Sequence, residues 1–148
     1  MKHREADMED LRSILSSHHS KADSTTAGAI KTISDEVHAT TSEIPDLFFD
    51  EILIKIKLTR TEVLLLMYLY RITWCRPNLH SKYGIAPMVS HIEISKSLDI
   101  SSEILHQTIR RLEGFNFIET IRSGQYFVRK YFTEEYDRKY GQTYDNFL

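Results

Sequence analysis

The segment at residues 102–113, SEILHQTIRRLE, carries side chains whose chemistry suits nucleic acid. Arg110 and Arg111 can donate hydrogen bonds to phosphate oxygens or to guanine, and Gln107 can pair with adenine. His106 can contact either a phosphate or a base. These residue types, close together in one short segment, indicate a surface that contacts the backbone and the base edges of DNA.

The spacing of apolar residues predicts that this segment is a helix with one buried face. Leu105, Ile109 and Leu112 recur at helical intervals, which leaves the polar side chains on the opposite face. Ser101 is placed to cap the helix, and both Ser101 and Ser102 lie where a helix N-terminus can meet a phosphate. A helix with its side chains is about 10–12 Å across, which a major groove about 12 Å wide admits. The sequence therefore predicts that helix 102–113 reads the major groove of double-stranded DNA.

A β-hairpin is predicted after this helix, because the periodicity changes from helical to extended. The segments FNFIETI and YFVRKYF read as strands and flank the turn RSGQ. Arg122 and Gln125 at this turn are expected beside the adjacent DNA backbone or the minor groove. Arg129 and Lys130 on the returning strand add positive charge. These four residues complete the predicted DNA-binding set.

Two capping boxes mark the starts of helices earlier in the chain. Thr59 is followed three residues later by Glu62, and Ser90 is followed in the same way by Glu93. The first box opens an almost wholly apolar stretch, so its helix is expected at the centre of the core. A further helix is expected to begin near Pro45, since proline is well tolerated in a first helical turn.

Together these elements predict a mainly α fold with a β-hairpin. The expected order is four helices, the hairpin, and a short C-terminal helix that Thr133 caps. Three helices that precede a hairpin, with a turn of only a few residues between the last two, form the winged helix-turn-helix arrangement. We expect this domain, with its C-terminal helix, to occupy residues 44–148.

The first 43 residues differ in composition and are expected to form a polar N-terminal arm. Residues 1–43 include no aromatic residue and are rich in Ser, Thr and Ala. Apolar residues recur at helical spacing within residues 8–15 and 30–37, so two weak amphipathic helices can be drawn there. The arm is therefore either a partly flexible tail or a segment that binds a protein partner or a second copy.

The composition allows one domain of ordinary size in addition to the arm. Of the 148 residues, 41% are hydrophobic and 27% are charged, which suffices for a buried core. The net charge of −2 argues against a protein that holds nucleic acid by bulk charge. Between residues 101 and 132, five bases and three acids leave a surplus of two positive charges. Because specific DNA binding needs several phosphate contacts, we expect a homodimer on paired half-sites.

The sequence shows no motif for catalysis, for a metal ion or for a cofactor, and we expect none of the three. It has no phosphate-binding glycine loop, no His/Cys set at metal spacing and no nucleophile elbow.

Cys75 is the single cysteine, which fits a reducing cytoplasm. The N-terminus is charged and lacks the apolar run of a signal peptide. The longest apolar stretch, residues 63–70, is far shorter than the roughly 20 residues needed to cross a membrane. A cytoplasmic protein without membrane contact is expected.

Two alternatives stay open from the sequence. Arg110 and Arg111 can form a merely solvated face, since Glu103 and Glu113 are near enough to pair with them. The domain can also be a winged-helix module that binds a protein partner instead of DNA, because its net charge is close to neutral.

Residues 44–131 resemble a known family of DNA-binding domains. The entry IPDLFFDEIL, the sequence RITW, and LE followed by NFIE are similar to the N-terminal winged-helix domain of phage and plasmid replication initiators of the replication protein O type. The second half is also similar to winged helices of bacterial regulators. The resemblance implies a sequence-specific DNA-binding protein that acts in transcriptional control or in the replication of a mobile element. O-type initiators carry a further C-terminal region that this chain lacks, so an accessory role in replication is expected.

Overall fold

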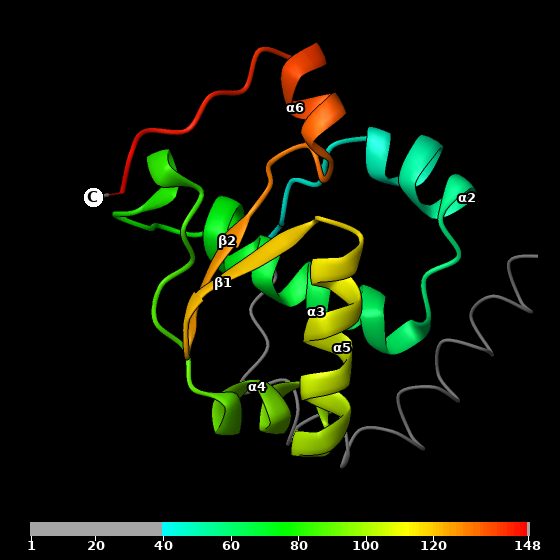
Figure 1. Ribbon diagram of the computed structural model, residues 1–148, viewed down its shortest axis with the longest axis vertical. Helices are drawn as coiled ribbons and strands as arrows, with labels where there is room; N and C mark the ends of the chain where they lie inside the picture. Colours follow the sequence, from blue (N-terminus) through cyan, green and yellow to red (C-terminus); the bar gives the residue numbers. More distant parts are fainter. Residues whose placement is uncertain (1–39, 148) are drawn as a thin grey trace, which may run out of the picture. The chain divides into compact units, whose positions relative to one another are not determined.

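The computed structural model describes residues 40–147, and the chain divides into two units between Thr41 and Ser42. The labelled helices and strands of Figure 1 belong to the second unit, Ser42–Leu148. This unit is mainly helical and contains a two-stranded antiparallel hairpin, so the coarser part of the predicted fold class is confirmed. The two helical patterns expected in the N-terminal arm lie outside the described residues.

The chain enters this unit through a π-helical turn, η1 (Phe48–Ile52), which runs into a short helix, α2 (Leu53–Lys55). The backbone N–H of Phe48 donates to the carbonyl of Pro45 at 2.9 Å, so Pro45 stands at the start of the helical segment as predicted. Phe48 and Ile52 point into the core and are buried. The apolar pattern of so short a segment does not distinguish π-helical from α-helical winding, and the sequence did not indicate it.

Helix α3 (Arg60–Tyr70) supplies the centre of the core. Its predicted capping box is present, because the Thr59 side chain accepts from the backbone N–H of Glu62 and the Glu62 carboxylate accepts from the N–H of Thr59. The helix continues into the π-helical turn η2 (Arg71–Cys75). The leucines of α3 that no solvent reaches are Leu65, Leu66 and Leu69.

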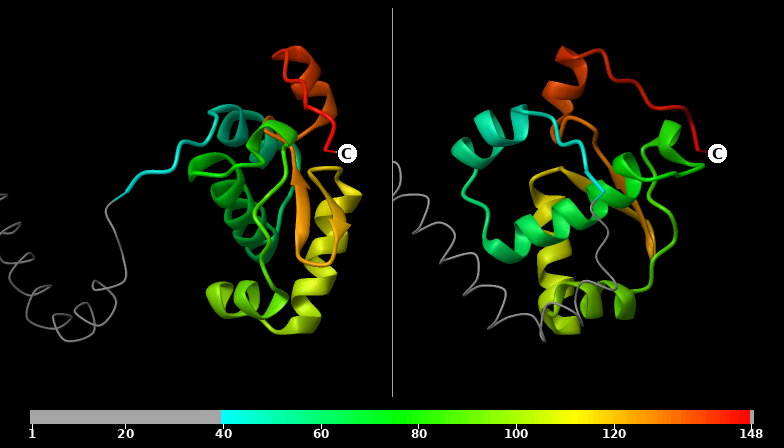
Figure 2. Two further views of the ribbon diagram at one scale, coloured as in Figure 1. Left: turned by 90° about the vertical axis from the view of Figure 1, so that its left-hand side faces the viewer. Right: turned by 180° about the vertical axis from the view of Figure 1, so that it is seen from behind.

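Helices α4 (His91–Leu98) and α5 (Ser102–Gly114) pack against each other at the end of the unit opposite α6 (Glu134–Lys139) (Figures 1 and 2). A 3-10 turn, η3 (Ser81–Tyr83), precedes them. The second predicted capping box, between Ser90 and Glu93, starts α4. Asp99 ends α4 with a φ of 52°, a left-handed conformation that Asp tolerates better than most residues. Ser101 then caps α5, so the predicted tight turn between the two helices is confirmed.

Strands β1 (Ile118–Arg122) and β2 (Gln125–Val128) form the predicted antiparallel hairpin, in which Ile118 pairs with Val128. Asn116 has a φ of 63° and makes the left-handed turn from α5 into β1. The chain that leads into α4 runs along β2, because the N–H of Ala86 donates to the carbonyl of Tyr126 at 2.9 Å. This backbone pairing joins the hairpin to the segment before α4.

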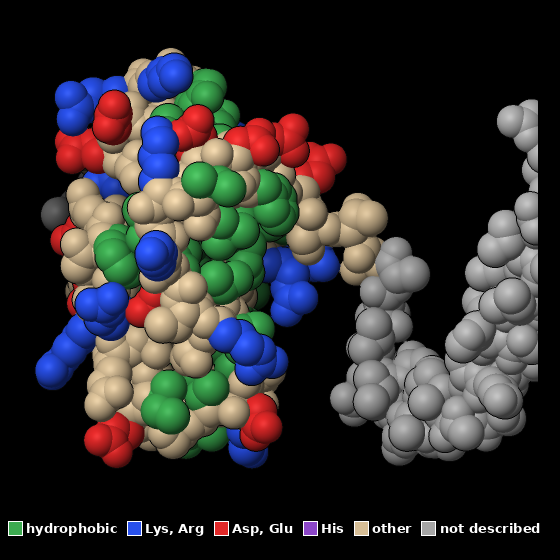
Figure 3. Space-filling view, turned by 90° about the vertical axis from the view of Figure 1, so that its right-hand side faces the viewer, with side chains coloured by type: hydrophobic (Ala, Val, Ile, Leu, Met, Phe, Trp, Pro, Cys, Tyr) green, Lys and Arg blue, Asp and Glu red, His purple; other side chains and the backbone are tan. Residues whose placement is uncertain are grey.

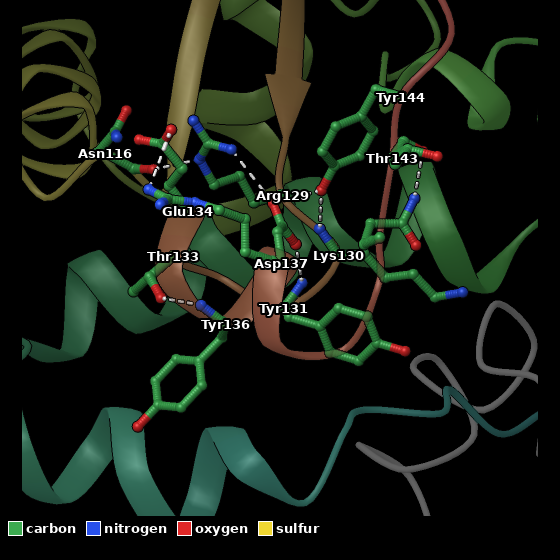
Figure 4. Close-up of polar contacts among 12 residues, drawn as sticks. Asn116, Arg129, Lys130, Tyr131, Thr133, Glu134, Tyr136, Asp137, Thr143 and Tyr144 are labelled. Atoms are coloured by element: carbon green, nitrogen blue, oxygen red, sulfur yellow. Dashed lines mark hydrogen bonds and ion pairs between the residues drawn. The ribbon is translucent and has the colours of Figure 1, made fainter.

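Helix α6 is held to the hairpin by the buried carboxylate of Asp137 (Figure 4). Its Oδ2 atom accepts hydrogen bonds from the Arg129 guanidinium at 3.2 Å and from the Tyr144 hydroxyl at 2.7 Å. Its Oδ1 atom accepts from the backbone N–H of Tyr131 at 3.1 Å. Thr133 caps α6 as predicted. A single side chain therefore binds three points of the chain that follows β2.

Phe132 fills the core between α6 and the helices at the start of the unit. Its ring is fully buried, with its centroid 5.0 Å from that of Phe48 and 5.1 Å, stacked, from that of Tyr70. Its φ of 72° costs an L-residue roughly 1–2 kcal/mol. Burial of the ring and its two aromatic contacts offset this strain.

Candidate nucleic-acid interface

The outer face of α5 is the surface that the sequence singled out. Leu105, Ile109 and Leu112 are buried beneath it, with Ile109 only 7% exposed, so the predicted buried face is confirmed. The helix packs against α3, α4 and β1, which fixes the direction in which its other face points (Figure 2). The side chains exposed on that other face are Ser102, Glu103, His106, Gln107, Arg110 and Arg111.

The two arginines of α5 differ in their surroundings. The Nε of Arg111 lies 3.3 Å from the buried carboxylate of Glu62, the residue that also caps α3. Its guanidinium also lies over the ring of Phe115, 5.3 Å from the centroid. In contrast, the side chain of Arg110 forms no hydrogen bond or ion pair with any residue between 40 and 147. Arg110 therefore keeps all its donors for an external acceptor, whereas Arg111 already serves the fold.

The two carboxylates near these arginines, Glu103 and Glu113, do not form ion pairs with them among the described residues. Glu113 accepts hydrogen bonds from both the backbone N–H and the hydroxyl of Thr120 on β1. Glu103 forms no ion pair within the part of the chain that the structure describes. The alternative in which Glu103 and Glu113 pair with Arg110 and Arg111 is therefore not what the structure has.

The N-terminal half of α5 presents two serines, an imidazole and an amide. The Ser101 hydroxyl is occupied as the helix cap, since it accepts from the N–H of Ile104 at 3.2 Å. The Nδ1 of His106 lies 2.7 Å from the carbonyl of Ser102, so Nδ1 carries the hydrogen and donates it. Gln107 forms no side-chain hydrogen bond with another described residue. Gln107 and the Nε2 of His106 thus remain for external partners.

A second histidine, which the sequence did not single out, lies against His106. His91 is the first residue of α4, and its ring meets that of His106 edge to face with centroids 4.8 Å apart. Its Nε2 lies 2.7 Å from the hydroxyl of Tyr126 on β2. Burial raises the pKa of Tyr126, so this hydroxyl keeps its proton and can donate it to the imidazole. The contact joins residues 35 positions apart, and no local pattern marks it.

The hairpin turn contributes one exposed arginine rather than two polar contacts. Arg122 is exposed, and its Nε donates to the Oε1 of Gln125 at 3.0 Å. Gln125 itself is only 3% exposed. Its side chain therefore orients Arg122. Because Gln125 is buried, it cannot make the predicted contact with DNA in this structure.

Arg129 and Lys130 follow the end of β2 and take part in the fold (Figure 4). The Arg129 side chain is 16% exposed, pairs with Asp137, and donates from Nε to the carbonyl of Asn116 at 3.0 Å. The ammonium of Lys130 lies over the ring of Trp74, 5.6 Å from the centroid. Both cations are engaged within the chain, so they stand apart from the free donors of α5.

A shallow depression of about 520 Å³ lies between the start of α4 and the hairpin turn. Its lining includes Ser90, His91, Ser123 and Gly124. The same His91 contacts His106 of α5, so the depression borders the exposed face of that helix. The surface available to a ligand thus extends beyond α5 towards α4 and the turn.

Other kinds of site are not found among residues 40–147. No group of three or more His, Cys, Asp or Glu residues there could hold a metal ion. Within the same range, no helix has both the length and the apolar character to span a lipid bilayer. Comparisons with protein-family models, curated proteins and solved structures give no match for this chain. The functional argument therefore depends on the geometry of α5 and its neighbours.

Proposed function

We propose that the unit Ser42–Leu148 is a winged helix-turn-helix domain that binds double-stranded DNA in a sequence-specific way. In this proposal α4 and α5 are the helix-turn-helix, α5 enters the major groove, and the β1–β2 hairpin is the wing. The biological role is control of transcription or an accessory part in the replication of a mobile element.

The observation that carries the proposal is the pair of unengaged side chains on the outer face of α5. Arg110 and Gln107 are exposed and have no hydrogen-bonding partner among the described residues, while the underside of the helix is buried. Arginine and glutamine are the side chains that pair with guanine and adenine through two hydrogen bonds. A helix that is fixed by its apolar face and has such donors free is ready to contact bases without first breaking internal contacts.

The charge balance supports binding by two copies. Arg111, Arg129 and Lys130 contact a carboxylate or an aromatic ring within the chain. Arg110 has no such contact and Arg122 donates only its Nε–H, to the neutral amide of Gln125, so these two are the most available cations of the α5 and hairpin region. Two phosphate or base contacts give one copy little affinity at physiological salt. Two copies on paired half-sites double the number of contacts, so we propose a homodimer on DNA.

Selection of bound duplexes from a random pool tests the proposal, since an enriched motif gives both the sequence and the half-site spacing. On the selected duplex, affinity should fall steeply between about 50 and 200 mM salt. Arg110→Ala should weaken binding by about 1–3 kcal/mol if it contacts a base, or lower the salt slope by about 0.9 if it contacts a phosphate. Arg138→Ala, at an exposed arginine on α6, is the matched control and should leave binding unchanged.

The same measurement separates the two adjacent arginines of α5. Arg110→Ala should leave thermal stability unchanged, whereas Arg111→Ala should also lower stability, because the buried carboxylate of Glu62 loses its cation and keeps only the N–H of Thr59. A pool without enrichment would count against DNA binding and favour the protein-partner alternative. Equal stability losses for both variants would contradict the assignment of Arg110 as the free arginine.

A further inference from the structure

Three neighbouring apolar side chains on the η1–α2 segment are open to solvent. Phe49 is 52% exposed, Leu53 is 37% exposed and Ile54 is 73% exposed. The π-helical winding of η1 brings residues four and five positions apart onto one face, so these three side chains form one patch. In the space-filling view of the side that carries α2, hydrophobic side chains form a continuous area with charged side chains at its edges (Figure 3).

This η1–α2 patch differs from the scattered apolar residues of an ordinary surface. Leu79 is 91% exposed, but it is the only exposed large hydrophobic residue of its loop. Single exposed apolar residues of this kind are common on protein surfaces. A contiguous apolar patch on a helix commonly marks a surface that another molecule covers. The other side of the same segment is already used, because Phe48 and Ile52 are buried in the core.

The charges at the two ends of the segment have opposite sign. Asp46 and Asp50 lie at its start, and Lys57 and Arg60 lie just beyond its end. All four are exposed, and none of their side chains forms an ion pair with another residue of the described range. In contrast, Glu51 and Lys55 neutralise each other in the middle of the segment. The segment is therefore acidic, apolar and basic in turn, with the charges at both ends unsatisfied.

We infer that this patch binds the same patch of a second copy of the chain, with the two segments antiparallel. A two-fold axis through the middle places Phe49, Leu53 and Ile54 of one copy against the same residues of the other. The antiparallel direction also places the acidic start of each segment beside the basic end of its neighbour. A second copy therefore supplies an apolar face and both complementary charged ends in one segment.

The size of the patch predicts a weak dimer. A segment of about ten residues is roughly 15 Å long, and a stable interface usually buries about 800 Å² on each partner. We therefore expect a dissociation constant in the micromolar range in the absence of DNA. If the proposed DNA binding holds, paired half-sites raise the effective concentration of the two copies and strengthen the same contact.

Sedimentation of the full chain without DNA, over about 5–500 µM, tests this inference independently of DNA binding. The wild-type chain should show a concentration-dependent dimer, and Ile54→Glu should raise its dissociation constant at least tenfold. Leu79→Glu places the same charge at an exposed leucine outside the patch and should leave dimerisation unchanged. A chain that stays monomeric throughout this range, or equal effects of the two variants, would overturn the inference.

Charge reversal identifies the second copy and its direction. Asp50→Lys places lysine against Lys57 of the neighbour, and Lys57→Asp places aspartate against Asp50, so each variant alone should dimerise more weakly. An equimolar mixture of the two variants restores both opposite-charge pairs and should form a heterodimer more tightly than either variant forms a homodimer. A mixture that dimerises no more tightly than its components would refute the antiparallel arrangement.

Self-association without duplex binding would reject only the proposed function, and duplex binding by a strict monomer would reject only this inference.

Discussion

Replacing Asp137 by alanine should lower the free energy of unfolding by about 3–5 kcal/mol. The carboxylate is 4% exposed and accepts hydrogen bonds from the Arg129 guanidinium, the Tyr131 N–H and the Tyr144 hydroxyl. Its removal leaves a largely buried guanidinium without its counter-charge, which alone typically costs about 3 kcal/mol or more. The stranded N–H of Tyr131 adds about 1–3 kcal/mol when water cannot replace the acceptor. Partial relaxation around the guanidinium keeps the total within the stated range.

Urea denaturation followed by circular dichroism measures this loss directly. A change of 3 kcal/mol or more corresponds to a drop in Tm of roughly 10–25 °C for a unit of this size. Glu135→Ala is the matched control, because Glu135 is an exposed carboxylate on the same helix and should change stability by no more than about 0.5 kcal/mol. A loss below about 1 kcal/mol for Asp137→Ala would refute the reasoning, since it would show that the three contacts are replaced by solvent.

The same series decides the role of Arg129. The sequence placed Arg129 among the DNA contacts, whereas the structure pairs it with Asp137. If the pair is structural, the double variant Arg129→Ala/Asp137→Ala should lose less unfolding free energy than the two single variants lose together. The difference should be about 1 kcal/mol or more. Additive losses within about 0.5 kcal/mol would show that the two side chains act independently.

Two further predictions follow from the backbone and from the buried phenols. Gly124→Ala should destabilise the unit by about 1–3 kcal/mol in thermal melts, because Gly124 has a φ of 81° and a Cβ atom would lie 2.9 Å from the backbone carbonyl of Val89. Gly114→Ala is the control: its Cβ atom meets no atom within 4 Å, so this variant should be neutral or stabilising. Burial raises the pKa of Tyr144 above its ordinary value of 10.0, so its contribution to stability is complete below about pH 10 and is lost as the pH rises further. Tyr144→Phe should therefore reduce the fall in unfolding free energy with pH above about pH 10. Tyr140→Phe changes an exposed tyrosine and is the control. If Tyr144→Phe leaves the slope of unfolding free energy against pH unchanged, this prediction is wrong.

The local features of the fold were predictable because they depend on residues three or four positions apart. The capping boxes that begin with Thr59 and Ser90 satisfy backbone amides within one helical turn, so sequence spacing alone reveals them. The buried stripe of α5 follows from its period in the same way. The left-handed positions Asp99 and Asn116 also bear residue types that tolerate this conformation.

The long-range contacts were not predictable by the same reasoning. The pair of Arg111 with Glu62 joins residues 49 positions apart, and the contact of His91 with Tyr126 joins residues 35 positions apart. Each depends on how helices and strands cross, which no spacing in the chain records. Phe132 is a sharper case, since an aromatic residue gives no local reason for a φ of 72°, and only its enclosure by the core explains it.

The way α5 is anchored explains why two adjacent arginines can have different tasks. Successive residues of a helix point about 100° apart, so Arg111 lies at the edge of the exposed face, where its Nε reaches Glu62 of α3, while Arg110 lies away from α3 on the same face. Glu113, two residues further on, bonds Thr120 and attaches the C-terminal end of α5 to the hairpin. The edge-to-face imidazoles connect its N-terminal half to α4. Because both ends of the helix are attached by contacts that do not involve Arg110, the backbone that carries Arg110 is already fixed, and binding at this position has to order only the side chain.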